Sequence, residues 1–118
     1  MKIIRTNIKD LENNKKLLYR LTRAGGKNVN DLEGSWPVTS WCLYTDVNSK
    51  GIEQTVLSIL SADTDGVAVK LQTISATFQR DFLDIVDVMG DEAYSIDVVH
   101  GLTKNGRDFV TCELSFND

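Results

Sequence analysis

SATFQRDFLDIVDVMGDEAYSIDVVHGLTKNGRDFVTCEL, residues 75–114, decides how the rest of the chain must fold. Apolar side chains recur in its first half at helical spacing and form one stripe: Phe78, Phe82, Ile85, Val86 and Met89. Ser75 or Thr77 can cap the start of this helix, and Gly90 lies where a left-handed C-terminal residue is favoured. We therefore predict one amphipathic helix whose apolar stripe faces a core.

A two-stranded hairpin is predicted after the helix. Its strands are expected at about Ser95–Val99 and Arg107–Leu114. Asn105-Gly106 is a strong turn signal between them, because both residue types tolerate positive φ. The helix and the hairpin then form one unit, against which the preceding residues must pack.

Three further strands are predicted before the helix, at Val38–Asp46, Glu53–Ser61 and Val67–Thr73. Polar turns separate them, and Pro37 restricts the first to a strand start or a sheet edge. The resulting order is β-β-β-α-β-β. We expect a mostly β chain with the OB-fold, a five-stranded Greek-key barrel with one helix between its third and fourth strands.

The N-terminal extension, residues 1–31, has the least legible pattern. Ile3, Ile4 and Ile8 are compatible with a short strand. Asp10 could cap a brief helix that includes the later leucines, but Leu17–Thr22 is equally strand-like, and we favour a strand there. Asn28–Gly34 is predicted to be a polar connection.

Length and composition favour one globular domain, residues 1–118, because 42% of the 118 residues are hydrophobic and 25% are charged. The sequence contains no apolar run of membrane-spanning length and no signal-peptide core at its start. We therefore expect a cytoplasmic protein that does not enter a membrane. Cys42 and Cys112 are expected to be buried reduced thiols, with a disulfide or a metal pair as the alternative.

The net charge of −4 conceals an asymmetry. Residues 1–30 contain eight Lys and Arg but two acidic residues, whereas the remainder contains five Lys and Arg and fifteen Asp and Glu. A basic extension on an acidic body suggests an anionic partner. Alternatively, the extension lies across the acidic body itself.

An OB barrel binds ligands across its second and third strands and the two loops beside them. Four of the five cations beyond the extension fall in or near these elements: Lys50, Lys70, Lys104 and Arg107. Contacts to the backbone phosphates of a nucleic acid would explain this placement. The alternative is that hairpin tips carry such residues for solubility. Phe109 is expected on the open face of the last strand, where a base could stack on it. Trp41 and Tyr44 point to opposite faces of their own strand, so an unbulged strand would expose only one of these two residues.

Catalysis has little support in the sequence. His100 is the only histidine and has no nucleophile or carboxylate at a telling spacing. The helix also carries a row of carboxylates, Asp81, Asp84, Asp87 and Asp91. Such a row can bind a metal, but it is more often a solvated face. We predict a binding protein that is not an enzyme and that needs no metal or cofactor.

Four segments resemble small single-stranded DNA-binding proteins of tailed phages that infect Gram-positive bacteria: DLEGSWPVTSWCLYTD, TVLSILSADTDG, QTISATFQRDFLDIVDVMG and VVHGLTKNGRDFVTCELS. The resemblance implies an OB-fold that coats displaced strands during protein-primed replication, without sequence preference and without chemistry. Tyr44 matches a tyrosine on which the family stacks bases. Leu71 replaces another such tyrosine, so Trp36, Trp41 or Phe109 would take part of its role.

The leading hypothesis is therefore a sequence-nonspecific single-stranded DNA-binding protein that also contacts replication proteins, as a monomer or a dimer. Its expected DNA-binding residues are Trp36, Trp41, Tyr44, Lys50, Lys70, Lys104, Arg107 and Phe109. The alternative is an acidic OB-type interaction module that docks a basic replication or host partner. A third hypothesis is a Mg²⁺-dependent nuclease that uses the aspartate row.

Overall fold

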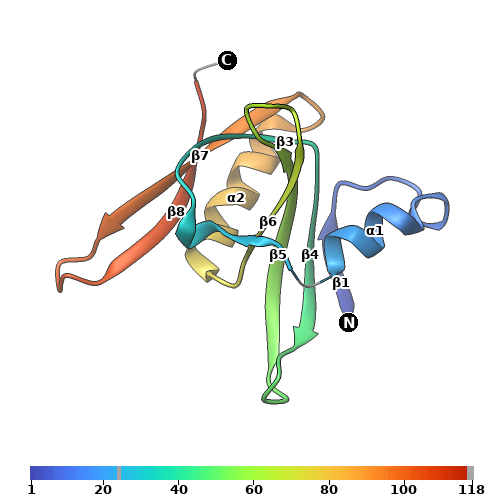
Figure 1. Ribbon diagram of the computed structural model, residues 1–118, viewed down its shortest axis with the longest axis horizontal. Helices are drawn as coiled ribbons and strands as arrows, with labels where there is room; N and C mark the ends of the chain where they lie inside the picture. Colours follow the sequence, from blue (N-terminus) through green and yellow to red (C-terminus); the bar gives the residue numbers. More distant parts are fainter. Residues whose placement is uncertain (24, 117–118) are drawn as a thin grey trace.

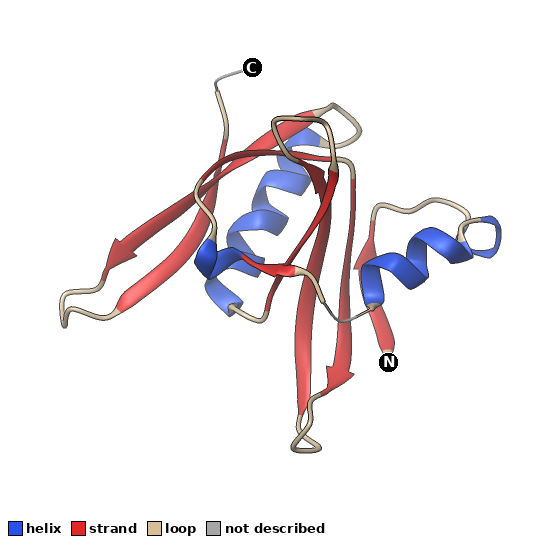
Figure 2. Ribbon diagram, in the orientation of Figure 1, coloured by secondary structure: helices blue, strands red, loops and turns tan. Residues whose placement is uncertain are grey.

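The protein is a mostly β chain with two α-helices, as a computed structural model that describes residues 1–23 and 25–116 shows (Figures 1 and 2). The expectation of a mostly β chain is confirmed. Residues 24, 117 and 118 of the predicted domain lie outside the described residues. None of the described helices is long and apolar enough to cross a membrane.

The strands form two sheets. The larger has the order β1-β4-β5-β6-β2, with β1 at Lys2–Thr6, β4 at Ser40–Val47, β5 at Glu53–Ala62, β6 at Ala68–Thr73 and β2 at Lys27–Asn28. The smaller has the order β3-β7-β8, with β3 at Gly34–Val38, β7 at Tyr94–Leu102 and β8 at Asp108–Leu114. Among the described residues, no strand pairing joins the two sheets into a closed barrel.

One continuous stretch of chain serves both sheets. The predicted strand Val38–Asp46 corresponds to β4 except at its start, where Val38 ends β3 and the chain changes sheets at Thr39. β3 pairs antiparallel with β7, whereas β4 pairs antiparallel with β5. Pro37 lies within β3, an edge strand, where a residue without an N–H removes no hydrogen bond from the sheet.

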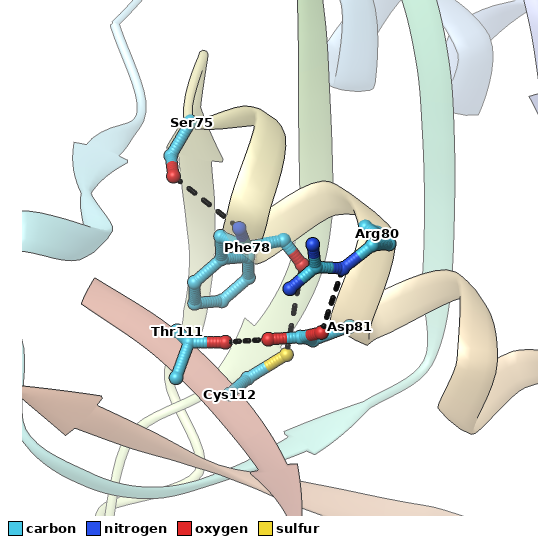
Figure 3. Close-up of polar contacts among 6 residues, drawn as sticks. All are labelled: Ser75, Phe78, Arg80, Asp81, Thr111 and Cys112. Atoms are coloured by element: carbon cyan, nitrogen blue, oxygen red, sulfur yellow. Dashed lines mark hydrogen bonds and ion pairs between the residues drawn. The ribbon is translucent and has the colours of Figure 1, made fainter. Parts of the chain in front are cut away.

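The helix α2, Ala76–Met89, packs between the two sheets. Ser75 is its N-cap, and its hydroxyl accepts a hydrogen bond from the Phe78 N–H. Phe78 and Phe82 are fully buried, as the apolar stripe predicted. Figure 3 shows how α2 is tied to β8: the Thr111 hydroxyl donates to the Asp81 carboxylate, beside Cys112.

The larger sheet has two differently covered faces. Its inner face turns toward α2 and is apolar, with Trp41, Leu43, Leu57, Ile59, Val69 and Leu71. Its outer face carries the alternating residues, including Cys42, Tyr44, Val56, Ser58, Leu60 and Gln72. The helix α1, Lys15–Thr22, packs on one end of this outer face.

The prediction of a strand at Leu17–Thr22 is wrong, because this segment belongs to α1. Leu17, Leu18 and Leu21 are spaced so that one helical turn presents all three to the outer face. A short 3-10 helix, η1 at Leu11–Asn13, precedes α1, and Asp10 makes no side-chain cap there. Tertiary contacts decide this segment, since a helix of eight residues is marginal alone.

The segment Lys27–Leu32 fills the space between β6 and the smaller sheet, as Figure 1 shows near the label β8. Lys27 and Asn28 form β2, which pairs in parallel with β6, and a 3-10 helix, η2 at Val29–Asp31, follows. Val29 is fully buried in the main core with residues of both sheets. The predicted polar connection therefore also completes the core.

Cys42 and Cys112 are both buried free thiols, as expected. Cys42 lies under α1, whereas Cys112 lies in the main core beside α2. Burial raises the pKa of the Cys42 thiol to about 11 and that of the Cys112 thiol to about 12. Both groups are therefore protonated and unreactive near neutral pH.

Candidate functional site

The hairpin of β7 and β8 extends from the body and carries two exposed cations (Figure 1). Its turn follows the prediction: the Thr103 carbonyl accepts from the Gly106 N–H, and Gly106 has a φ of +78°. The turn displays Lys104 and Arg107, and neither forms an ion pair with a residue that the structure describes. Both charges are therefore available to an anionic partner.

Phe109 lies flat against the backbone of the opposite strand, close to the turn of this hairpin. It pairs across the strands with Gly101, and a Cβ built on Gly101 would lie 2.4 to 3.1 Å from three atoms of the phenyl ring. One side of the ring is thus supported by the glycine, while the side chain remains 39% exposed. This arrangement fixes a flat aromatic surface beside two free cations, which suits base stacking.

A hollow of about 290 Å³ occupies the part of the outer face that α1 leaves open. It is lined by residues of four strands and the loops beside them, among them Asn28, Tyr44, Asp46, Gln54, Val56 and Gln72. Asp46 and Gln54 face each other across β4 and β5, and Asn28 is opposite Gln72 across β2 and β6. Polar groups therefore surround an apolar floor.

Three cations belong to chain segments next to this hollow but do not line it. Lys50 is in the turn that joins β4 to β5, Lys27 precedes Asn28 in β2, and Arg23 follows α1. None of the three forms an ion pair with a described residue. The Arg23 guanidinium lies 5.8 Å from the centre of the exposed Tyr19 ring. Positive charges thus lie in chain segments next to those that line the hollow, whereas the lining itself is neutral or acidic.

A second hollow, of about 290 Å³, lies between the segment Lys27–Leu32 and the hairpin. It is lined by Asn30 on one side and by Gly101 and Phe109 on the other. Asn28 and Asn30 are two residues apart, so this one segment borders both hollows. We call the two hollows, together with the cations in the neighbouring segments, the candidate interface.

Tyr44 lies at the floor of the first hollow but is only 2% exposed. Its hydroxyl is 3.4 Å from the Ser58 hydroxyl and accepts from the Gln72 amide at 3.4 Å. Burial raises the pKa of the Tyr44 phenol. In this arrangement the ring offers no open side to a base.

Trp41 lies on the inner face, opposite to Tyr44, and is also buried. Its ring meets the Phe82 ring edge-on with centroids 5.5 Å apart. The expectation that strand parity would expose one of Trp41 and Tyr44 is therefore wrong, because α2 covers one face and α1 the other.

Lys70 supports the fold at the outer face. Its ammonium donates hydrogen bonds to the backbone carbonyls of Arg20 and Arg23, which satisfies acceptors at the C-terminal end of α1. Burial and the two nearby arginines lower the pKa of Lys70. The side chain therefore holds α1 in place, and its ammonium is engaged by backbone carbonyls.

Trp36 is distant from both hairpins that carry cations. It is half-buried in β3, its indole N–H donates to the Glu33 carbonyl, and it borders a hollow with Ala62 and Asp63. Ala62 ends β5, whereas Lys50 precedes the other end of that strand. The structure thus brings Lys104, Arg107 and Phe109 together, but it places Trp36 elsewhere.

The basic extension partly lies across the acidic helix, as one of the two charge hypotheses expected. Arg5 pairs with Asp87 at 2.6 Å, and Lys9 pairs with Asp91 at 3.6 Å. Asp81 accepts the Thr111 hydroxyl and pairs with Arg80. Within residues 1–23 and 25–116, no group of three or more His, Cys, Asp or Glu is arranged to hold a metal ion.

His100 lies in β7, and its Nε2 donates to the Leu32 carbonyl at 2.5 Å. This contact links the smaller sheet to the segment Lys27–Leu32, so the histidine has a structural partner. It also borders the second hollow.

Sequence reasoning missed the contributions of Gly101 and Asn28 to the candidate interface. The glycine precedes the hairpin turn, and its pairing with Phe109 depends on strand register, which the sequence left open. Asn28 gave no signal, because its place beside β6 comes from a parallel pairing of only two residues.

The candidate interface thus combines a supported aromatic ring, unpaired cations and two polar hollows that one chain segment borders. Comparison with known proteins adds no further constraint: no family model, characterised protein or solved structure matches the chain.

Proposed function

We propose that this chain is a single-stranded DNA-binding protein and that the candidate interface is its binding surface. The observation that carries the proposal is the Phe109 ring, held flat on Gly101 beside the unpaired Lys104 and Arg107. Single-stranded binding needs aromatic surfaces for bases and cations for phosphates, and this hairpin offers both. An acidic pI of about 4.9 is compatible with it, because phosphates respond to the local field.

We further propose that the fold is an opened OB-type barrel. The supporting observation is that Gly34–Val47 pairs with β7 through its first half and with β5 through its second, while α2 falls between β6 and β7. The segment Lys27–Leu32 lies where a pairing of β6 with β8 would close such a barrel. On this assignment, the outer face of β5 and β6 and the turns at Lys50 and Lys104 are the OB binding surface.

The biological role that fits this proposal is the coating of displaced single strands during phage DNA replication, as the resemblance of the sequence implies. Stacking on Phe109 and contacts to phosphates read no base sequence, so one strand could be covered throughout. Arg23, Lys27 and Lys50, from the segments next to the first hollow, would extend the phosphate track from the hairpin across the candidate interface.

The test is fluorescence anisotropy with a labelled oligo-dT of about 16 nucleotides, the upper site size of one OB fold. Replacing Lys104 and Arg107 together by Ala should weaken binding by about tenfold, since two phosphate contacts are lost. The matched control replaces Lys9 and Lys15 by Ala, which removes the same charge from residues that already form ion pairs. Equal loss in both variants would mean that only net charge matters and would contradict the proposed surface.

The competing function is an acidic module that docks a basic protein partner. The ion pairs of Arg5 with Asp87 in α2 and of Lys9 with Asp91 just after α2 favour it, because cations bind to this acidic region within the protein itself. Such a module would not bind oligo-dT at any salt concentration, and replacing Lys104 and Arg107 would not weaken its binding to the protein partner. The same titration therefore separates the two functions.

A further inference from the structure

The hollow on the open part of the outer face has a lining suited to an uncharged planar ligand. Its floor is formed by Val56, Ile74 and the buried Tyr44. Asp46 and Gln54 lie at one side and Asn28 at the other. At about 290 Å³ it is near the lower limit of small-molecule pockets, which suits a ligand of the size of one nucleobase.

The charges around the hollow favour a base inside it and a phosphate outside it. Asp46 would repel a phosphate placed in the hollow, and no cation lines it. Lys27 and Lys50 lie beyond its rim and form no ion pair with a described residue. A strand that passes over the rim could thus keep its phosphates on the lysines while one base turns inward.

The hydrogen-bonding groups decide which base fits. The Asp46 carboxylate accepts only one described hydrogen bond, from the Val47 N–H, so it retains several acceptor positions. The Gln54 amide makes no side-chain hydrogen bond with a described residue. Guanine presents two adjacent donors, N1–H and the N2 amino group, and these match the two oxygens of a carboxylate.

We propose that this hollow is a guanine subsite, in which the Asp46 carboxylate accepts from N1–H and N2–H of one unstacked base. Gln54 and Asn28 would meet the O6 and ring nitrogen edges, and Val56 would contact the ring. The inference rests on the proposed function and adds to it: an otherwise sequence-tolerant strand would gain a preference at one position.

The test compares oligo-dT with the same oligonucleotide carrying one central dG, by anisotropy with the full chain. The dG oligonucleotide should bind about tenfold more tightly, the gain expected from about 1.4 kcal/mol of bidentate pairing. Deoxyinosine lacks the N2 amino group, so replacing dG by it should remove most of the gain. A single dA or dC should bind like dT.

Asp46→Asn should abolish the preference for dG, so that the dG oligonucleotide and oligo-dT bind this variant equally. Glu53→Gln is the matched control, because it removes one negative charge from the adjacent strand end but Glu53 does not line the hollow. A preference for dG that survives in Asp46→Asn would overturn the proposal, as would equal binding of the dG and dT oligonucleotides.

A second measurement tests the hollow without a strand. Titration of the ¹⁵N-labelled protein with guanosine should shift the amide resonances of Gln54, Val56 and Gln72, and Asp46→Asn should remove these shifts. Absence of shifts at millimolar guanosine would overturn the subsite. If oligo-dT fails to bind but guanosine gives the expected shifts, the proposed function is wrong and the subsite stands by itself.

Discussion

The two faces of the larger sheet differ in how completely they are covered. The inner face is mostly apolar where α2 covers it, with Phe82 fully buried against Trp41. The outer face alternates apolar and polar residues, and α1 covers only one end of it. The inner face therefore contributes mainly to the stability of the fold, whereas the outer face leaves polar groups accessible to a ligand.

The largest predicted effect comes from breaking the inner face. Phe82→Ala should lower the free energy of unfolding by about 3–5 kcal/mol, because it removes a fully buried ring and leaves a cavity. Urea denaturation followed by tryptophan fluorescence measures it. Val88→Ala on the exposed face of α2 is the control and should change stability by no more than about 0.5 kcal/mol. Similar losses in both variants would contradict the assigned inner face.

A smaller effect is expected from the outer face under α1. Leu21→Ala should cost about 2 kcal/mol, the lower limit for a buried leucine, because α1 can detach while the main core persists. Amide hydrogen exchange should accelerate in residues 15–22 and at Cys42 but not in α2. Uniform acceleration throughout the chain would show that the two faces unfold together.

The two buried thiols should make the free energy of unfolding depend on pH in the alkaline range. Their pKa values are raised from 9.0 to about 11 for Cys42 and about 12 for Cys112, so above pH 9 the folded state holds more protons than the unfolded state. The free energy of unfolding should therefore fall between pH 9 and 10, with a limiting slope of about 1.4 kcal/mol per pH unit for each thiol. Cys42→Ala should reduce that slope, as measured by urea denaturation at each pH. An unchanged slope in Cys42→Ala would contradict the burial of that thiol.

The smallest effect concerns the aromatic support at the hairpin. Gly101→Ala places a Cβ within 2.4 Å of the Phe109 ring and should displace it. The affinity for oligo-dT should then fall by about fivefold, near the lower limit for losing one stacking contact. Anisotropy measures the affinity, and circular dichroism checks that the sheet remains. Full affinity with a displaced ring would remove Phe109 from the proposed interface.

Local patterns in the sequence were sufficient for the second half of the fold. The helical stripe from Phe78, the cap at Ser75 and the turn at Gly106 all lie where short-range spacing placed them. Long-range contacts decided the first half. Leu17–Thr22 became helical because its leucines meet Cys42 and Tyr44, about twenty residues further along, and Lys70 holds its end.

The sequence predicted the candidate site only in the β7/β8 hairpin, where the pairing of two neighbouring strands determines which side chains are exposed. Parity exposed Phe109, and the turn exposed Lys104 and Arg107. The covering of Tyr44 by α1 and the use of Lys70 as a support for α1 could not be read locally. Both depend on an extension that folds back onto a distant face.

The most direct test of this account determines by NMR which part of the protein surface single-stranded DNA contacts. Oligo-dT added to the ¹⁵N-labelled protein should shift amide resonances of the outer face and the hairpin, around Gln54, Gln72, Gly101 and Phe109. Resonances on the exposed acidic face of α2, around Asp84 and Val88, should remain in place. Shifts confined to α2, or no shifts at low salt, would contradict binding at the candidate interface.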